Sequence, residues 1–219
     1  KLFLDTFKIF DCHFVPRKKN IKDFYNKGAQ KVIYLPLAYE PTVHYASKEK
    51  NNKNIDVSFI GSPYDKRADF LQSIYDLGNN LEVRGDRRWK RAFSNKNIYK
   101  NEEAQNDKYR NTIWRSKINL AFITHSNEEE VAHRSFEIPA CGGFMLSEKS
   151  VKLQTYYIED KEIVYFSDVK ECDDKIKFYL KNDDIREKIA IAGYNRAVSS
   201  GYSNDERIKL AISEYLESL

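Results

Sequence analysis

The sequence has little of what marks secreted, zinc-binding or membrane-spanning proteins. It holds only 3 cysteines in 219 residues, and Cys12, Cys141 and Cys172 lie too far apart to form a zinc-binding motif. An odd number of dispersed cysteines also disfavours a disulfide framework, so we expect a reducing, cytoplasmic compartment. No apolar run reaches the roughly 18 residues of a membrane-spanning helix, and the first residues lack the apolar core of a signal peptide.

The excess of charge of one sign is small as well, which weighs against a nucleic-acid partner. The sequence has 37 Lys and Arg against 33 Asp and Glu, for a formal net charge of +4. These charges are spread along the chain, whereas a nucleic-acid module concentrates basic residues on one face or arm. Apolar residues are plentiful by contrast: 41% of the chain is hydrophobic, with 15 Tyr and 13 Phe. This content is enough for a globular core.

Short apolar runs alternate with helical patterns, which predicts an α/β fold. Strands are expected at 12–15, 31–37, 55–61, 81–85, 118–124, 144–147 and 162–166. Helices are expected at 17–28, 64–77, 101–117, 135–142, 150–157, 168–180, 183–198 and 204–218. Because continuous apolar strands separated by helices are typical of sheets buried on both faces, we expect a Rossmann-like parallel sheet with helices on both sides.

The residues that follow the strands are the candidates for a ligand site, because open parallel sheets bind ligands beyond the carboxyl ends of their strands. Gly61 and Ser62 form a small-residue turn into a helix N-terminus, which can present backbone N–H groups to a phosphate. Arg84 follows the next strand and could supply a guanidinium to a diphosphate. Arg134 and Glu137 share one helix face, where the cation could meet phosphate and the carboxylate could accept hydrogen bonds from ribose hydroxyls.

Each of these features also has a purely structural interpretation. The turn at Gly61 could merely connect two elements, and Arg134 and Glu137 could form an ion pair worth about 0.2 to 0.5 kcal/mol. The chain could be a non-catalytic nucleotide-binding or interaction module of Rossmann or flavodoxin-like fold. It could also bind single-stranded nucleic acid through a basic, aromatic-containing patch. The residues of that patch are Arg84, Arg87, Arg88, Trp89, Lys90 and Arg91.

One segment carries a family resemblance. Residues 134–146, RSFEIPACGGFML, resemble the signature of the CgeB-like (spore-maturation) glycosyltransferases, a branch of the GT-B superfamily. Similar stretches, VIYLPLAYEP and DVSFIGSPYDKR, extend the resemblance over nearly the whole chain. It implies two Rossmann-like domains facing each other across a cleft. Residues 1–45 would be the end of the N-terminal acceptor domain and the crossover, 46–203 the C-terminal nucleotide-sugar-binding domain, and 204–219 a helix that packs back toward the N-terminal part.

The resemblance implies a glycosyltransferase that moves a hexose or related sugar from a nucleotide-diphosphate sugar to a glycan, protein or small-molecule acceptor. Glu137 occupies the place of the glutamate that binds the donor's ribose hydroxyls. Glu129 occupies the place of the glutamate near the transferred sugar, and with Arg134 it is the implied catalytic pair. The other donor-binding residues implied by the resemblance are Gly61, Ser62, Arg67, Arg84, Gly142 and Gly143.

No metal and no cofactor are expected. Breaking a sugar–phosphate bond builds negative charge on the departing diphosphate, and in a GT-B site of this kind cationic side chains and helix N-termini stabilise that charge. No D-x-D element follows a strand; the pairs at 173–174 and 183–184 lie in polar, helical surroundings. The chain begins at Lys1 and not at Met, so upstream sequence is expected, and the chain alone is expected to bind donor better than it transfers sugar.

Overall fold

Two parallel sheets organise the protein, whose computed structural model describes residues 6–49, 52–93, 97–100 and 104–217. A two-stranded sheet pairs β1 with β2, and a five-stranded sheet has the order β4-β3-β5-β6-β7. Every neighbouring pair in the larger sheet is parallel. The strands are β1 (His13–Val15), β2 (Val32–Tyr34), β3 (Ile55–Gly61), β4 (Leu81–Gly85), β5 (Ser116–Ala121), β6 (Met145–Glu148) and β7 (Val164–Phe166).

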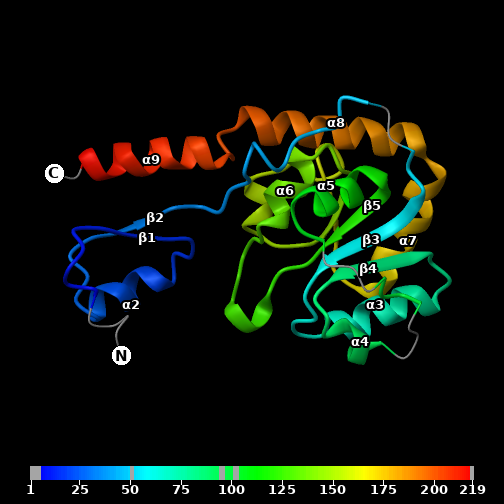
Figure 1. Cartoon of the computed structure of the whole chain (residues 1–219), viewed down its shortest axis with the longest axis horizontal. Coiled ribbons are helices and arrows are strands. Elements are labelled where there is room, and N and C mark those ends of the chain that lie inside the picture. Colours follow the sequence, from blue (N-terminus) through cyan, green and yellow to red (C-terminus); the bar gives the residue numbers. More distant parts are fainter. Residues whose placement is uncertain (1–5, 50–51, 94–96, 101–103, 218–219) are drawn as a thin grey trace.

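Helices connect the strands and cover both faces of the larger sheet (Figure 1). The helices are α2 (Asn20–Asn26), α3 (Arg67–Asp76), α4 (Trp89–Ala92), α5 (Asn106–Arg115), α6 (Arg134–Ala140), α7 (Val169–Lys181), α8 (Asp183–Ser199) and α9 (Asn204–Leu216). Two short 3-10 turns occupy His125–Asn127 and Leu153–Thr155. The described chain therefore alternates strand and helix from β3 to β7, as the sequence pattern predicts.

The core of the larger body has one layer on each face of the sheet. Phe59 of β3 joins the cluster that includes side chains of α3 and α7, whereas its neighbour Ile60 joins the cluster that includes side chains of α5 and α6. Leu120 and Ala121 of β5 divide in the same way. Successive side chains of a strand point to opposite faces, so these continuous apolar strands are buried on both sides. The expected α/β fold with a parallel sheet is confirmed.

Several expected helices are shorter in the structure, including those expected at 17–28 and 64–77. The helix expected at 150–157 is only the 3-10 turn Leu153–Thr155, because so short a segment is marginal as a helix and one turn suffices to bury Leu153 and Tyr157. The helix expected at 101–117 is described as α5, which begins at Asn106. Its expected start, at 101–103, lies outside the described residues.

The smaller sheet and α9 lie on the same side of the larger body (Figure 1). One segment leads from β2 to the larger body, and a second leads from α8 of the larger body to α9. The two segments are joined by backbone hydrogen bonds. Tyr39 N–H donates to the carbonyl of Tyr202 at 3.1 Å, and Asn204 N–H donates to the carbonyl of Tyr39 at 2.8 Å. The predicted domain limits at 45/46 and 203/204 stay a prediction.

Gly193 of α8 lets this helix approach the turn before β7. A Cβ at position 193 would overlap the backbone carbonyl oxygen of Glu162. Replacing glycine with alanine inside a helix normally stabilises the helix by about 1 kcal/mol. Here the overlap must displace α8, so we expect Gly193→Ala to lower the free energy of unfolding by about 1 to 3 kcal/mol. Urea denaturation measures the sign, with exposed Ile191→Ala as the control. A more stable Gly193→Ala protein would contradict this packing.

Candidate functional site

The strand order creates a switch point between β3 and β5. From β3 the chain continues to β4, which pairs with one edge of β3, and it then crosses over to β5, which pairs with the other edge of β3. Open parallel sheets bind ligands at such points, outside the carboxyl ends of the strands. A cavity of about 620 Å³ lies here, and Ser62 after β3 and Thr124 after β5 both line it. Four predicted site residues line this switch-point cavity: Ser62, Arg67, Glu129 and Arg134.

Arg67 and Arg134 bring two guanidinium groups together at this cavity. Arg67 is only 5% exposed and donates from Nη2 to Thr124 Oγ1 at 2.9 Å and from Nη1 to the carbonyl of Ser62 at 3.3 Å. Burial and the positive charge of Arg134 lower the pKa of Arg67. The Nε atoms of both arginines are buried, and no described residue offers them a hydrogen-bond partner. Within the described residues, neither guanidinium forms an ion pair with a carboxylate, so both keep donors available for an anion.

Gly61 is required where Arg134 reaches the end of β3. A Cβ on Gly61 would lie 3.1 Å from Arg134 Nη2 and even closer to the ring of Phe59. The carbonyl of Gly61 accepts a hydrogen bond from Trp89 Nε1 at 2.8 Å. Glycine therefore allows the guanidinium to lie against the turn that leads to Ser62, and Trp89 fixes that turn from the core side.

Ion pairs connect the smaller sheet to the far side of the cavity. Arg17 Nη2 lies 2.7 Å from Glu129 Oε1, and Lys19 Nζ lies 2.8 Å from Glu128 Oε2. The sequence prediction missed Arg17 and Lys19 as site residues, although the run of basic residues at 17–19 begins two residues after the end of β1 and offered a signal. The carboxylate of Glu129 therefore lines the cavity with a cation already beside it.

Glu137 lies one turn beyond Arg134 on α6 and has partners of its own. Tyr109 Oη of α5 donates to Glu137 Oε2 at 2.7 Å, and His44 Nε2 lies 3.8 Å from Glu137 Oε1. Burial, together with the adjacent carboxylate, raises the pKa of Tyr109. Burial lowers the pKa of His44, although Glu137 opposes that shift. The ion pair that the purely structural interpretation required between Arg134 and Glu137 is not formed, so each side chain has a separate environment.

A comparison with protein families identifies the chain. Residues 50–213 match a family described as Glycosyl transferase-like. The chain belongs to this family. The match extends from the segment before β3 into α9, so it includes every predicted site residue. No curated protein sequence matches the chain.

Solved structures share the fold of this glycosyl transferase-like chain at low identity. Sucrose-phosphate synthase from Thermosynechococcus elongatus has a TM-score of 0.69 at 11% identity, over 99% of this chain and 61% of that one. Anabaena HepE in complex with UDP and glucose has a TM-score of 0.70 at 12% identity, over 100% and 66%. A glycosyltransferase from Rickettsia africae has a TM-score of 0.71 at 12% identity, over 99% and 67%. The chain thus spans about three fifths to two thirds of these structures, and the expected GT-B fold class is confirmed.

The remaining predicted site residues of this glycosyl transferase-like chain have structural surroundings. Arg84 is 9% exposed, and its Nη2 lies 2.7 Å from Glu82 Oε2. Gly142 has a φ of +71° at the end of α6, where other residues are strained. A Cβ on Gly143 would lie 2.5 Å from the side chain of Ile113. These contacts explain Gly142 and Gly143 by packing, and a role of the three residues in donor binding stays a prediction.

The basic patch at 84–91 offers no aromatic surface from its tryptophan. Trp89 is fully buried, with 0% exposure, and its ring stacks on Phe93 at a centroid distance of 5.0 Å. Arg88 pairs with Asp86, with Nη2 and Oδ2 2.6 Å apart. Because base stacking on an exposed ring supplies much of the affinity for single strands, this arrangement disfavours the nucleic-acid interpretation.

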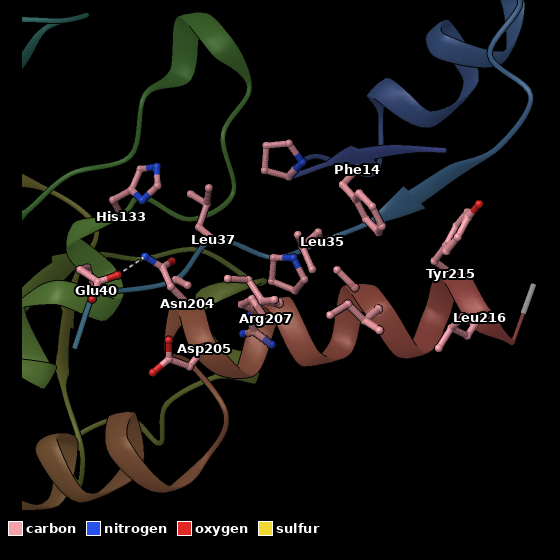
Figure 2. A pocket seen from close by; sticks show the side chains of 16 residues that line it. Phe14, Leu35, Leu37, Glu40, His133, Asn204, Asp205, Arg207, Tyr215 and Leu216 are labelled. Carbon is pink, nitrogen blue, oxygen red and sulfur yellow. Dashed lines mark hydrogen bonds between the residues drawn. The ribbon is translucent and has the colours of Figure 1, made fainter. Parts of the chain in front are cut away.

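A second, apolar cavity of about 640 Å³ lies between α9 and the smaller sheet. Figure 2 shows Leu35 and Phe14 facing Tyr215 across it, and the hydrogen bond from Asn204 Nδ2 to Glu40 Oε2, 2.9 Å long, near its other end. Leu37 and His133, with Pro16, also line the switch-point cavity, so the two cavities adjoin. The side chains that line this second cavity are mostly apolar and do not suit a diphosphate.

Two searches of the described residues bear on cofactors and membranes. In the ranges that the structure describes, no group of three or more His, Cys, Asp or Glu side chains is arranged to hold a metal ion. In the same ranges, no helix combines the length and the apolar character needed to cross a bilayer. The expected independence of metals and cofactors stays a prediction.

Proposed function

We propose that the chain is the donor-binding part of a metal-independent GT-B glycosyltransferase of the CgeB-like branch. It would move a hexose or related sugar from a nucleotide-diphosphate sugar to an acceptor. The observation that carries this proposal is the pair of adjacent guanidinium groups, Arg67 and Arg134, at the switch-point cavity without a carboxylate partner among the described residues. Two like charges held together at the end of a sheet are unfavourable by themselves, and a diphosphate would compensate both.

The chemistry of sugar transfer fits this pair. When the bond between the anomeric carbon and the diphosphate breaks, negative charge grows on the diphosphate oxygens, and preorganised cations lower the energy of that state. Arg67 and Arg134 would hold the diphosphate from the two sides of the switch point, with Gly61 and Ser62 at its base. Structures of HepE contain UDP and UDP-glucose, and this supports a nucleotide sugar as the donor.

The two glutamates would act at the two ends of the donor. Glu137 would accept hydrogen bonds from the ribose hydroxyls, and Glu129 would lie near the transferred sugar. The ion pair of Arg17 with Glu129 supports the latter role, because it fixes the position of this carboxylate at the cavity where positive charge would develop on the anomeric carbon. The acceptor would enter from the side of the smaller sheet, where Arg17 lies.

Calorimetric titration with UDP, GDP, ADP and TDP tests this proposal. We expect one nucleotide to bind the wild-type chain at micromolar concentration, because a diphosphate can form several charge-assisted hydrogen bonds with the two guanidinium groups. Glu137→Ala should weaken the binding of that nucleotide by about 1 to 3 kcal/mol, the usual range for losing a charged hydrogen-bond acceptor. Glu214→Ala, an exposed carboxylate on α9, is the matched control and should bind like the wild type. Absence of binding by every nucleotide at millimolar concentration, with the protein folded, would contradict the proposal.

A further inference from the structure

One oxygen of the Glu137 carboxylate accepts a hydrogen bond from the protein, and the side chain keeps 19% of its surface exposed. Its Oε2 accepts a hydrogen bond from Tyr109 Oη at 2.7 Å, and the Tyr109 side chain is only 6% exposed. The ring of Tyr109 belongs to the core layer between α5 and α6, so its hydroxyl has a fixed position. Because a phenol donates one hydrogen bond, Oε1 of Glu137 keeps its capacity to accept hydrogen bonds from a ligand.

The ring of His44 lies near the second oxygen, Oε1, and has a defined tautomer. The backbone N–H of Glu40 donates to His44 Nδ1 at 3.1 Å, so the neutral ring carries its proton on Nε2. The Nε2 atom lies 3.8 Å from Glu137 Oε1, which is too long for a direct hydrogen bond. A hydroxyl group can donate to a carboxylate and accept from an N–H at the same time, so a ligand hydroxyl placed beside these two atoms would pair with both.

The segment that carries His44 is fixed to α5. Arg110 Nη1 donates to the carbonyl of Val43 at 2.7 Å, and the guanidinium of Arg110 lies 4.1 Å from the ring centroid of Tyr45. The ring of His44 also meets the ring of Tyr109 edge to face, with centroids 5.7 Å apart. The gap between His44 and Glu137 is therefore set by packed neighbours on both sides.

We propose that His44 and Glu137 together bind a ribose hydroxyl of the donor, that Tyr109 positions the carboxylate for it, and that the site thereby selects ribonucleotides over 2′-deoxyribonucleotides. The inference rests on the proposed function. A site built to pair with a hydroxyl rejects an analogue that lacks it, because the analogue leaves the Nε2–H and Oε1 desolvated and unpaired. His44 and Tyr109 lie outside the motif that carries Glu137. The crossover segment after β2 supplies His44, and α5 supplies Tyr109.

Titration calorimetry with UDP, GDP and ADP, each beside its 2′-deoxy form, tests this selection. We expect the wild type to bind the preferred ribonucleotide at least ~10-fold more tightly than its 2′-deoxy form. Tyr109→Phe should lower the affinity for the ribonucleotide ~3- to 10-fold and leave the affinity for the 2′-deoxy form nearly unchanged. His44→Ala should remove the preference in the same way, whereas His44→Gln, which keeps an N–H donor, should restore part of it.

A matched control separates this role from a structural one. Tyr157 is a buried tyrosine whose hydroxyl has no hydrogen-bond partner in the part of the chain that the structure describes, so Tyr157→Phe should change neither affinity. Equal weakening of both nucleotide forms by Tyr109→Phe, or equal wild-type affinity for the two forms, would overturn this inference and leave the proposed function intact. Absence of nucleotide binding by the folded wild type would instead overturn the proposed function. If Tyr109→Phe does not fold, the two His44 variants decide the question.

Discussion

Arg134→Met is expected to weaken nucleoside-diphosphate binding by about 10- to 100-fold while it stabilises the unliganded chain. The loss of affinity follows because a hydrogen bond to a charged group contributes about 1.5 to 3 kcal/mol. The gain in stability follows because the pKa of Arg67 is lowered by burial and by the charge of Arg134. Methionine removes this repulsion and can still pack on the ring of Phe59, whose centroid lies 5.9 Å from the Arg134 guanidinium. For a chain of this size we expect the melting temperature to rise by about 2 °C or more.

Calorimetry and a thermal melt measure the two effects on the same sample. Arg91→Met, at an exposed arginine of α4, is the control and should alter neither quantity. A lower melting temperature with unchanged affinity for the nucleotide would show that Arg134 is a structural residue. Opposite signs of the two changes are the signature of a side chain that is retained for binding at the expense of stability.

Trp89→Ala is expected to lower the free energy of unfolding by about 3 to 5 kcal/mol, the range for deleting a large buried aromatic side chain. The Trp89 ring is fully buried, stacks on Phe93 and meets the edge of Phe59 at a centroid distance of 5.9 Å. Its Nε1 also donates to the carbonyl of Gly61, so the turn at the switch-point cavity should loosen and nucleotide affinity should fall as well.

Guanidinium denaturation followed by circular dichroism measures this loss. Trp89→Phe is the matched variant, and it should cost less because it retains most of the apolar area and because Asp86 N–H still donates to the Gly61 carbonyl at 3.2 Å. A Trp89→Ala protein that keeps its full stability but loses affinity for single-stranded nucleic acid would instead support the nucleic-acid interpretation.

The sequence predicts the site best where a general rule of parallel sheets applies. Gly61 ends β3 and Ser62 follows it, Arg67 begins the next helix, and Arg134 belongs to α6, yet all lie near the same end of one sheet. Continuous apolar strands indicate the sheet, and the carboxyl ends of parallel strands meet at one edge. This rule places the segments that carry Arg67 and Arg134, 67 residues apart, near each other, whereas Arg67 itself was implied only by the family resemblance.

The partners of the glutamates could not be predicted in this way. Arg17 and Glu129 are 112 residues apart, and Tyr109 reaches Glu137 from a different helix, so both contacts depend on how whole elements pack. The surroundings of Arg84 were accessible to sequence analysis. Residues two apart on a strand point to the same face, and Glu82 therefore lies beside Arg84 as an ion-pair partner.

Backbone amide shifts during titration with UDP test the central claim most directly, because they locate the bound nucleotide. The proposed donor site predicts that the largest shifts in the ¹H–¹⁵N spectrum fall at residues 61–67 after β3 and 134–137 of α6, with smaller shifts at residue 44. Arg134→Met should suppress them. Shifts confined to residues 208–216, along the apolar cavity beside α9, or no shifts at millimolar UDP, GDP and ADP, would contradict a nucleotide-sugar site at the switch point.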